Sequence, residues 1–220
     1  MSITNYTSLR DAIAGSSSTS WSHRNDLLGV FDTFLQLVEE RIYKGGEKTG
    51  GEFVDGLRIR ALETRSTATL STSSRFLALP DNFLQARRAE LEYGNAIYPL
   101  EFVTAPDLLE STSAGRPCRF TVTSQYEFDR TPDVAYTIEV QHYAKQTAIS
   151  SSNATNDILT NFPSIYLYGC MAEVYKWTQN VEKAAQFNDL FLNSIKEANT
   201  QDKWGRVGPT PSMTNRESIV

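Results

Sequence analysis

The spacing of apolar residues changes twice along this sequence, and that order constrains the fold more than any other feature. Between residues 26 and 43, apolar residues recur at steps of three and four, which is typical of an amphipathic helix. Several segments within residues 57–145 alternate apolar and polar positions, which predicts strands. The helical spacing returns between residues 162 and 198. This order, with no internal repeat, predicts an α+β fold with a central antiparallel β segment.

Local signals place the individual elements. The predicted helices span residues 7–14, 26–43, 162–178 and 181–198, and they flank a β segment at residues 57–145. Leu57–Glu63 alternates and predicts the first strand, Phe83–Leu91 is ambiguous between strand and helix, and Thr104–Leu109 predicts a short capped helix. The last two helices form a hairpin joined near Asn180.

The helical spacing of apolar residues stops after residue 199. Turn-forming residues predominate from Thr200 onward, and only Ile219 and Val220 are available for burial at the end. We therefore expect residues 1–199 to form a single domain and residues 200–220 to form an extended C-terminal arm that orders only against a partner.

Composition excludes several classes of protein. The chain has 220 residues, of which 40% are hydrophobic, which is too many for a disordered protein. Its 21 basic and 26 acidic side chains give 21 − 26 = −5, which excludes binding to DNA mainly through charge. No apolar run approaches the roughly 20 residues that cross a bilayer, so we expect no membrane contact. The N-terminal residues lack the pattern of a signal peptide, and the two separated cysteines suit a reducing cell.

Motifs for catalysis and for cofactors are weak. In the segment Gly45–Thr49, Glu47 stands directly before Lys48, where a phosphate-binding loop needs glycine. The two histidines, His23 and His142, have no Cys or His at the spacing of metal ligands. A Gly-x-Ser-x-Gly turn is missing from the sequence. We therefore expect no enzyme activity, no metal and no cofactor.

Two groups of charged residues keep alternatives open. Paired carboxylates for glycoside cleavage could come from Glu39 with Glu40, or from Glu90 with Glu92, although a solvated helix or strand face is the simpler and favoured explanation of both pairs. Arg58 and Arg60 would share one face of a strand, where they could contact phosphate or the carboxylates of a partner. Further arginines with this potential are Arg65, Arg87 and Arg88.

Six segments, taken in order, carry a resemblance to a known family. They are Leu57–Glu63, Phe76–Leu84, Pro99–Leu108, Gly115–Pro117, Tyr136–Tyr143 and Asn161–Gly169. Together they resemble the adaptor, or head-to-tail connector, proteins of tailed bacteriophages. The similarity extends over Ala12–Ala198, and it rests on the order and spacing of the segments.

The resemblance implies a structural virion protein. Such a protein would form a ring, most often of twelve copies, beneath the portal protein, and the ring would extend the DNA channel and contact a tail or nozzle protein. Double-stranded DNA would pass through the channel without specific binding. The protein would lie at the head–tail interface of the virion, and in the host cytoplasm during assembly.

In such connectors the terminal arm commonly docks on the portal. By position, the portal-binding residues would be Trp204, Arg206, Val207, Arg216, Ile219 and Val220. The alternatives are a tail-completion or tail-tube protein, a virion-associated peptidoglycan hydrolase, and a cellular binding module that forms a stable monomer.

Overall fold

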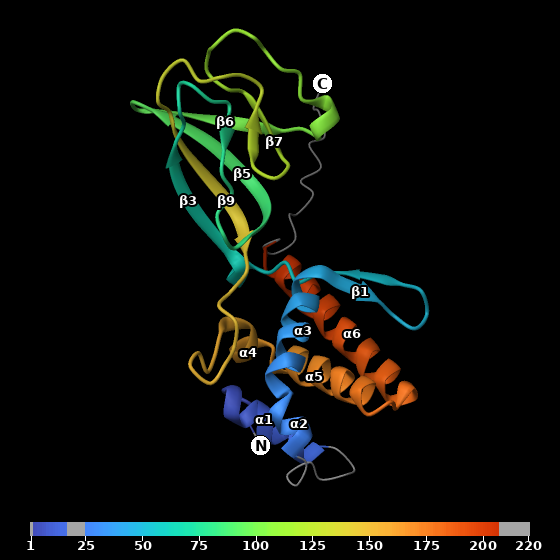
Figure 1. Ribbon diagram of the computed structural model, residues 1–220. Coiled ribbons are helices and arrows are strands. Elements are labelled where there is room, and N and C mark those ends of the chain that lie inside the picture. The colour runs from blue at the N-terminus through green and yellow to red at the C-terminus, as the bar shows by residue number, and fades with distance from the viewer. Residues whose placement is uncertain (1, 17–24, 207–220) are drawn as a thin grey trace, which may run out of the picture. The chain divides into compact units, whose positions relative to one another are not determined.

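The chain forms two compact units, and the second interrupts the sequence of the first. The computed structural model describes residues 2–16 and 25–206 (Figure 1). The first unit comprises Met1–Ala61 and Thr147–Val220, and the second comprises Leu62–Gln146. Helices dominate the first unit and a sheet dominates the second, so the α+β class is confirmed. That residues 1–199 act as a single domain stays a prediction.

The first unit is built from six helices and a short β hairpin within its described residues. The helices are α1 (Tyr6–Ser16), α2 (Asn25–Gly29), α3 (Phe31–Lys44), α4 (Asp157–Asn161), α5 (Pro163–Trp177) and α6 (Val181–Arg206). The hairpin pairs β1 (Gly45–Glu47) with β2 (Phe53–Asp55). Among the described residues, no helix has the length and apolar character needed to cross a membrane.

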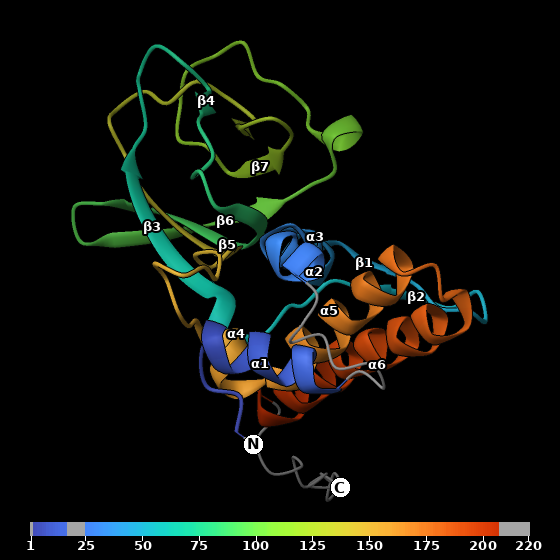
Figure 2. The ribbon, with the colours of Figure 1, turned by 60° about the horizontal axis from the view of Figure 1, so that its bottom comes forward.

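The core of the first unit lies where α3, α5 and α6 pack together (Figures 1 and 2). Buried apolar residues from the three helices fill this space, including Val38 from α3 and Phe191 from α6. Gly169 of α5 permits the close approach, because a Cβ atom there would lie 2.6 Å from Val38 Cγ1 and 3.1 Å from the Phe191 ring. The helical spacing in the sequence therefore did report the buried faces.

Several predicted boundaries in the first unit differ from the structure. The helix expected at residues 26–43 is interrupted at Val30, so it forms α2 and α3. The helix ends at Lys44, one residue beyond the predicted end, and the next residue, Gly45, adopts a φ of 76° that favours glycine. The residues that follow form the β1–β2 hairpin. The last helix continues to Arg206, so residues 200–206 are helical and not an extended arm.

The segment Leu57–Glu63 is not the strand that its alternation predicted. Leu57 and Ile59 are buried as expected, but the backbone N–H of Leu57 donates to the Ile42 carbonyl at 2.7 Å, and the N–H of Arg58 donates to an α6 side chain. A 3-10 turn follows at Arg60–Leu62. Alternation reports which side is buried, whereas a strand also needs a neighbouring strand, and here the backbone partners lie on helices.

The second unit is a seven-stranded sheet. Its strands are β3 (Glu63–Thr69), β4 (Phe76–Leu77), β5 (Phe83–Tyr93), β6 (Ala96–Phe102), β7 (Arg119–Val122), β8 (Tyr126–Phe128) and β9 (Thr137–Ala144). Their order in the sheet is β3-β9-β5-β6-β7-β8-β4. The ambiguous segment at Phe83 is thus a strand, and the predicted short helix is a 3-10 turn at Ala105–Asp107.

One pair of strands departs from the predicted antiparallel arrangement. β6 and β7 are parallel, with Glu101 opposite Arg119 and Phe102 opposite Phe120. Parallel neighbours need a long connection, because the chain must return to the end of the sheet from which it started. Residues 103–118 form this connection between β6 and β7, which a tight hairpin could not do. Buried side chains from both parts of the sheet, including Phe120 and Val140, form one apolar core.

The packing at Gly169 generates the first prediction. We expect Gly169→Ala to lower the free energy of unfolding by about 1–3 kcal/mol, because the added methyl group overpacks the core. Gly15→Ala in α1 is the control, since a Cβ atom there meets no atom within 4 Å and alanine favours helix. Urea denaturation of both variants measures the difference. Equal stability of the two variants would show that the helices do not pack as closely as described.

Candidate assembly surface

The C-terminal end of α6 is where the sequence predicted an arm. The helix extends to Arg206 in part because Lys203 and Arg206 lie in its last turn, where positive charge favours the helix dipole. Trp204 in that turn is 74% exposed, which is unusual for so large an apolar side chain. The structure therefore presents an exposed tryptophan on a regular helix.

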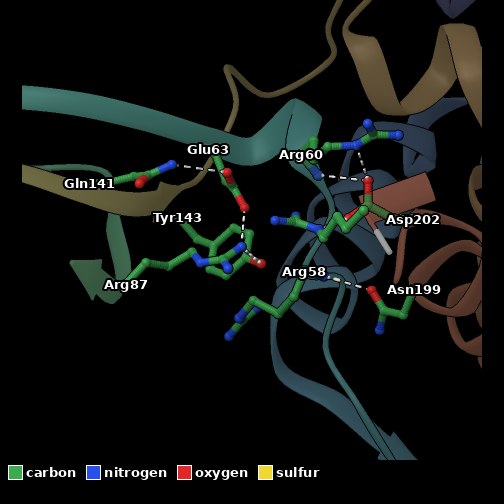
Figure 3. A network of polar contacts seen from close by, with 9 residues as sticks. Arg58, Arg60, Glu63, Arg87, Gln141, Tyr143, Asn199 and Asp202 are labelled. Carbon is green, nitrogen blue, oxygen red and sulfur yellow. Dashed lines mark hydrogen bonds and ion pairs between the residues drawn. The ribbon is translucent and has the colours of Figure 1, made fainter. Parts of the chain in front are cut away.

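Residues 56–60 cross the end of α6 and are bound to it through their backbone (Figure 3). The N–H of Arg58 donates to Asn199 Oδ1 at 2.7 Å, and Asn199 Nδ2 donates to the Gly56 carbonyl at 3.2 Å. The N–H of Arg60 donates to Asp202 Oδ1 at 3.1 Å. Asn199 and Asp202 are three residues apart, so they lie on the same face of the helix.

Asp202 is the centre of this contact. Arg60 Nε donates to Oδ1 at 2.9 Å, and Arg206 Nε donates to Oδ2 at 2.6 Å. Burial tends to raise the pKa of Asp202, but the hydrogen bonds from Arg60 and Arg206 outweigh it and hold the pKa below its ordinary value. The carboxylate thus binds the crossing segment and the last turn of α6 at once.

Two of the six portal-binding candidates, Trp204 and Arg206, lie among the described residues, and they differ in their contacts. Trp204 is free to contact another protein, whereas the guanidinium of Arg206 is engaged with Asp202. The other four candidates, Val207, Arg216, Ile219 and Val220, lie outside the described residues. A portal-binding role for all six stays a prediction.

The arginines considered for phosphate contacts are bound within their own units. In the first unit, Arg58 donates to the carbonyls of Tyr43 and Leu57, at 3.2 and 2.8 Å, and Arg60 pairs with Asp202. In the second unit, Arg65 pairs with Glu139 at 3.0 Å.

Arg87 and Arg88 of the second unit are likewise paired. Arg87 binds Glu63 and the Tyr143 hydroxyl, and Gln141 also donates to Glu63 (Figure 3). Arg88 pairs with Glu90. Each arginine that the sequence suggested for nucleic-acid contact is thus already hydrogen-bonded, most of them to carboxylates.

Three of the four candidate catalytic carboxylates have structural partners, and that of Glu90 is Arg88. Glu39 accepts a hydrogen bond from the Ile149 N–H at 2.7 Å and one from the Tyr166 hydroxyl at 3.2 Å. Burial raises the pKa of Glu39, and these two hydrogen bonds partly offset the rise. Glu40 pairs with Lys44, and Glu92 is exposed. The half-buried Glu39 carboxylate connects α3 to the chain before α4.

The motifs considered for cofactors occupy ordinary positions. Lys48 lies in the turn of the β1–β2 hairpin and pairs with Glu52 at 2.8 Å. His142 is buried on β9, and His23 lies outside the described residues. Within residues 2–16 and 25–206, no group of three or more His, Cys, Asp or Glu side chains could hold a metal ion.

Sequence reasoning missed the two residues that organise this surface. The predicted helix ends at residue 198 and the predicted arm begins at residue 200, so the sequence gives no reason to place Asn199 and Asp202 on a common helical face. Their spacing of three was the available signal, but it has meaning only if the helix continues past residue 199.

Comparison with known protein families gives a match over nearly the whole chain. The model of a family described as SU10 adaptor protein matches residues 4–212. A search of curated proteins found no match. The matched range contains the whole sheet unit and the described end of α6.

Asp202 generates the second prediction. We expect Asp202→Asn to release residues 58–60 and the last turn of α6, and to lower stability by about 1–3 kcal/mol through the loss of charge-assisted hydrogen bonds. Hydrogen–deuterium exchange at residues 56–60 and 199–206 measures the release. Glu197→Gln is the control, because it makes the same change of charge at an exposed position on the same helix. Unchanged exchange in Asp202→Asn would show that the Asp202 hydrogen bonds do not hold these two segments.

The lowered pKa of Asp202 generates a prediction on pH. Because the folded pKa lies below the ordinary value, the carboxylate's stabilisation is complete above about pH 3.9 and is lost as the pH falls through the folded pKa. The difference in melting temperature between the wild type and Asp202→Asn should therefore stay constant from pH 7 to pH 4 and shrink below that. A difference that grows on acidification would have the wrong sign for a lowered pKa.

Proposed function

The chain belongs to the SU10 adaptor protein family, whose members are phage head–tail adaptors, and from that premise we propose that it forms a ring beneath the portal and extends the DNA channel. As an adaptor it is a structural component of the head–tail junction, and portal and tail proteins are its partners. The ring is expected to contain twelve copies. The chain would fold in the host cytoplasm before it joins the virion.

The observation that carries the proposal is an exposed tryptophan on a fixed helix end. Trp204 is 74% exposed, while Asn199 and Asp202 bind the crossing backbone immediately before it. Aromatic anchors supply much of the binding energy at protein interfaces. An anchor that is already ordered loses less conformational entropy on binding. Trp204 is therefore suited to insert into a pocket of the portal.

The remaining portal-binding candidates take different roles in this proposal. Arg206 acts as a positioning residue, because its pair with Asp202 holds the helical turn that carries Trp204. Val207, Arg216, Ile219 and Val220 would extend the contact along the portal. Each contact is modest alone, and repetition around a ring strengthens the whole attachment.

The charge of the chain fits passage of DNA without specific binding. The net charge is −5, and the five arginines considered for phosphate contact are engaged within the protein. Arginines that are engaged within the protein are less available to phosphate, so these five would hold passing DNA less strongly than free cations would. This supports a conduit and not a DNA-binding protein.

Replacement of Trp204 tests the proposal. We expect Trp204→Ala to lower occupancy of the portal ring of the same virus by about tenfold or more, because an interface anchor is lost. Sedimentation and negative-stain microscopy of the mixture measure occupancy and symmetry. Trp177→Ala is the matched control, since Trp177 is an exposed tryptophan at the end of α5.

A deletion complements the point variant. The deletion should remove residues 207–220 only, because Asn199 and Asp202 hold the fold of the first unit. We expect this variant to fold and to bind the portal weakly. Full occupancy by Trp204→Ala and by the deletion variant would refute portal docking through this end, and a sixfold or threefold ring would favour a tail-tube protein.

A further inference from the structure

The two ends of β5 carry apolar features of opposite shape. A cleft of about 310 Å³ lies at its first residues, and a β turn with exposed apolar side chains follows its last residue. Both features belong to the sheet unit. They therefore stand in a fixed relation to each other along a single strand.

The cleft exists because β5 lacks a neighbour on one side of its first half. β5 pairs with β6 only from Ala89 onward, while the end of β6 pairs with β7 through Glu101 and Phe102. In the strand pairings of the described residues, the start of β5 is therefore bonded to β9 alone. The cleft is lined by Phe83, Leu84, Gln85, Ala86, Arg87, Phe102, Phe120 and Val122.

Aromatic rings form the apolar surface of the cleft. Phe102 and Phe120 are in edge contact at 5.5 Å, and the ring of Phe83 contacts both Tyr126 at 5.6 Å and His142 at 5.5 Å. Phe102 is 59% exposed although it contributes to this surface. The buried Tyr126 hydroxyl and His142 Nε2 have no hydrogen-bond partner within the described chain.

The turn between β5 and β6 forms a projecting tip, the opposite shape to the cleft. It follows Tyr93, which is 52% exposed, and precedes Ile97, which is 64% exposed. Both views show this hairpin tip projecting beyond the neighbouring strands (Figures 1 and 2). Hairpin tips are commonly polar, so two large apolar side chains at a projecting tip indicate a contact surface.

Charge also matches the tip to the cleft. Glu92, beside the tip, is exposed and forms no ion pair with the described residues. Arg87 lines the cleft and its side chain is 36% exposed although it pairs with Glu63, and the side chain of Arg88 next to it is 65% exposed although it pairs with Glu90. A tip placed in the cleft would bring the Glu92 carboxylate toward two guanidinium groups.

We propose that the hairpin tip of one copy inserts into the cleft of the next copy. Arg87, the last β5 residue of the cleft, and Tyr93 at the tip are six residues apart along β5, or roughly 20 Å, so a molecule cannot fill its own cleft with its own tip. A contact between different surfaces of identical chains repeats from copy to copy, and it closes into a ring if the rotation permits. This inference rests on the proposed ring and identifies the contact that builds it.

Mixed cross-linking tests the contact in assembled protein. One chain carries Ile97→Cys, a second carries Phe102→Cys, and both carry Cys118→Ser to remove the exposed native thiol. We expect disulfide-linked dimers in the mixture and few in either variant alone, because the contact joins a tip to a cleft. Docked thiols meet at millimolar effective concentration, so the yield should exceed by about tenfold that of a control with Leu109→Cys in place of Ile97→Cys. Leu109 is at least as accessible as Ile97, with 74% against 64% exposure.

The outcomes separate this inference from the proposed function. The experiment uses the full chains alone at high concentration and again on portal rings. Portal binding without mixed dimers overturns the tip-to-cleft contact and leaves the portal role standing. Mixed dimers without portal binding support the contact and refute the portal role. Dimers of Ile97→Cys alone would indicate a tip-to-tip contact and would also overturn the inference.

A charge at the tip gives an independent measure. We expect Ile97→Asp to weaken association of the copies about tenfold or more, since a charged side chain replaces an apolar one in the cleft. Leu109→Asp, with the same change outside the contact, should associate like the wild type. Equal weakening in both variants would show that the loss comes from charge and not from the proposed contact.

Discussion

The bonds that Asn199 and Asp202 accept from the backbone at Arg58 and Arg60 fix the end of α6, and the candidate portal surface depends on them. A chain segment without a strand partner must satisfy its N–H groups elsewhere, and here two helix side chains do so. The same carboxylate holds Arg206 in the last turn. One set of hydrogen bonds thus orders the segment that leads into the sheet unit and the helix end that carries Trp204.

This arrangement suits a protein whose function is to join others. The helical unit would offer an ordered aromatic anchor to the portal, and the sheet unit carries both halves of a contact between copies. The two surfaces are formed by different parts of the chain, so attachment and ring closure can be changed separately. Each contact can be weak because a ring repeats it, and avidity then supplies the stability of the junction.

The sequence predicted those elements whose local pattern and burial agree. The spacing in α3 and the alternation in β9 were sufficient, because the buried side chains of each element pack into the core of its own unit. The strand predicted at Leu57–Glu63 was wrong, because alternation cannot distinguish a strand from an extended segment bound to a helix. The sequence did not predict the parallel β6–β7 pair or the Asp202 contacts, because each depends on residues far apart in sequence. Long-range partners are the information that spacing does not contain.

A cryo-electron microscopy reconstruction of this chain on the portal ring of the same virus would test the account most directly. The account predicts that residues 199–206 stay helical, as in the free chain, and that the Trp204 side chain is buried against the portal. A ring attached to the portal through another surface, with Trp204 exposed to solvent, would contradict it.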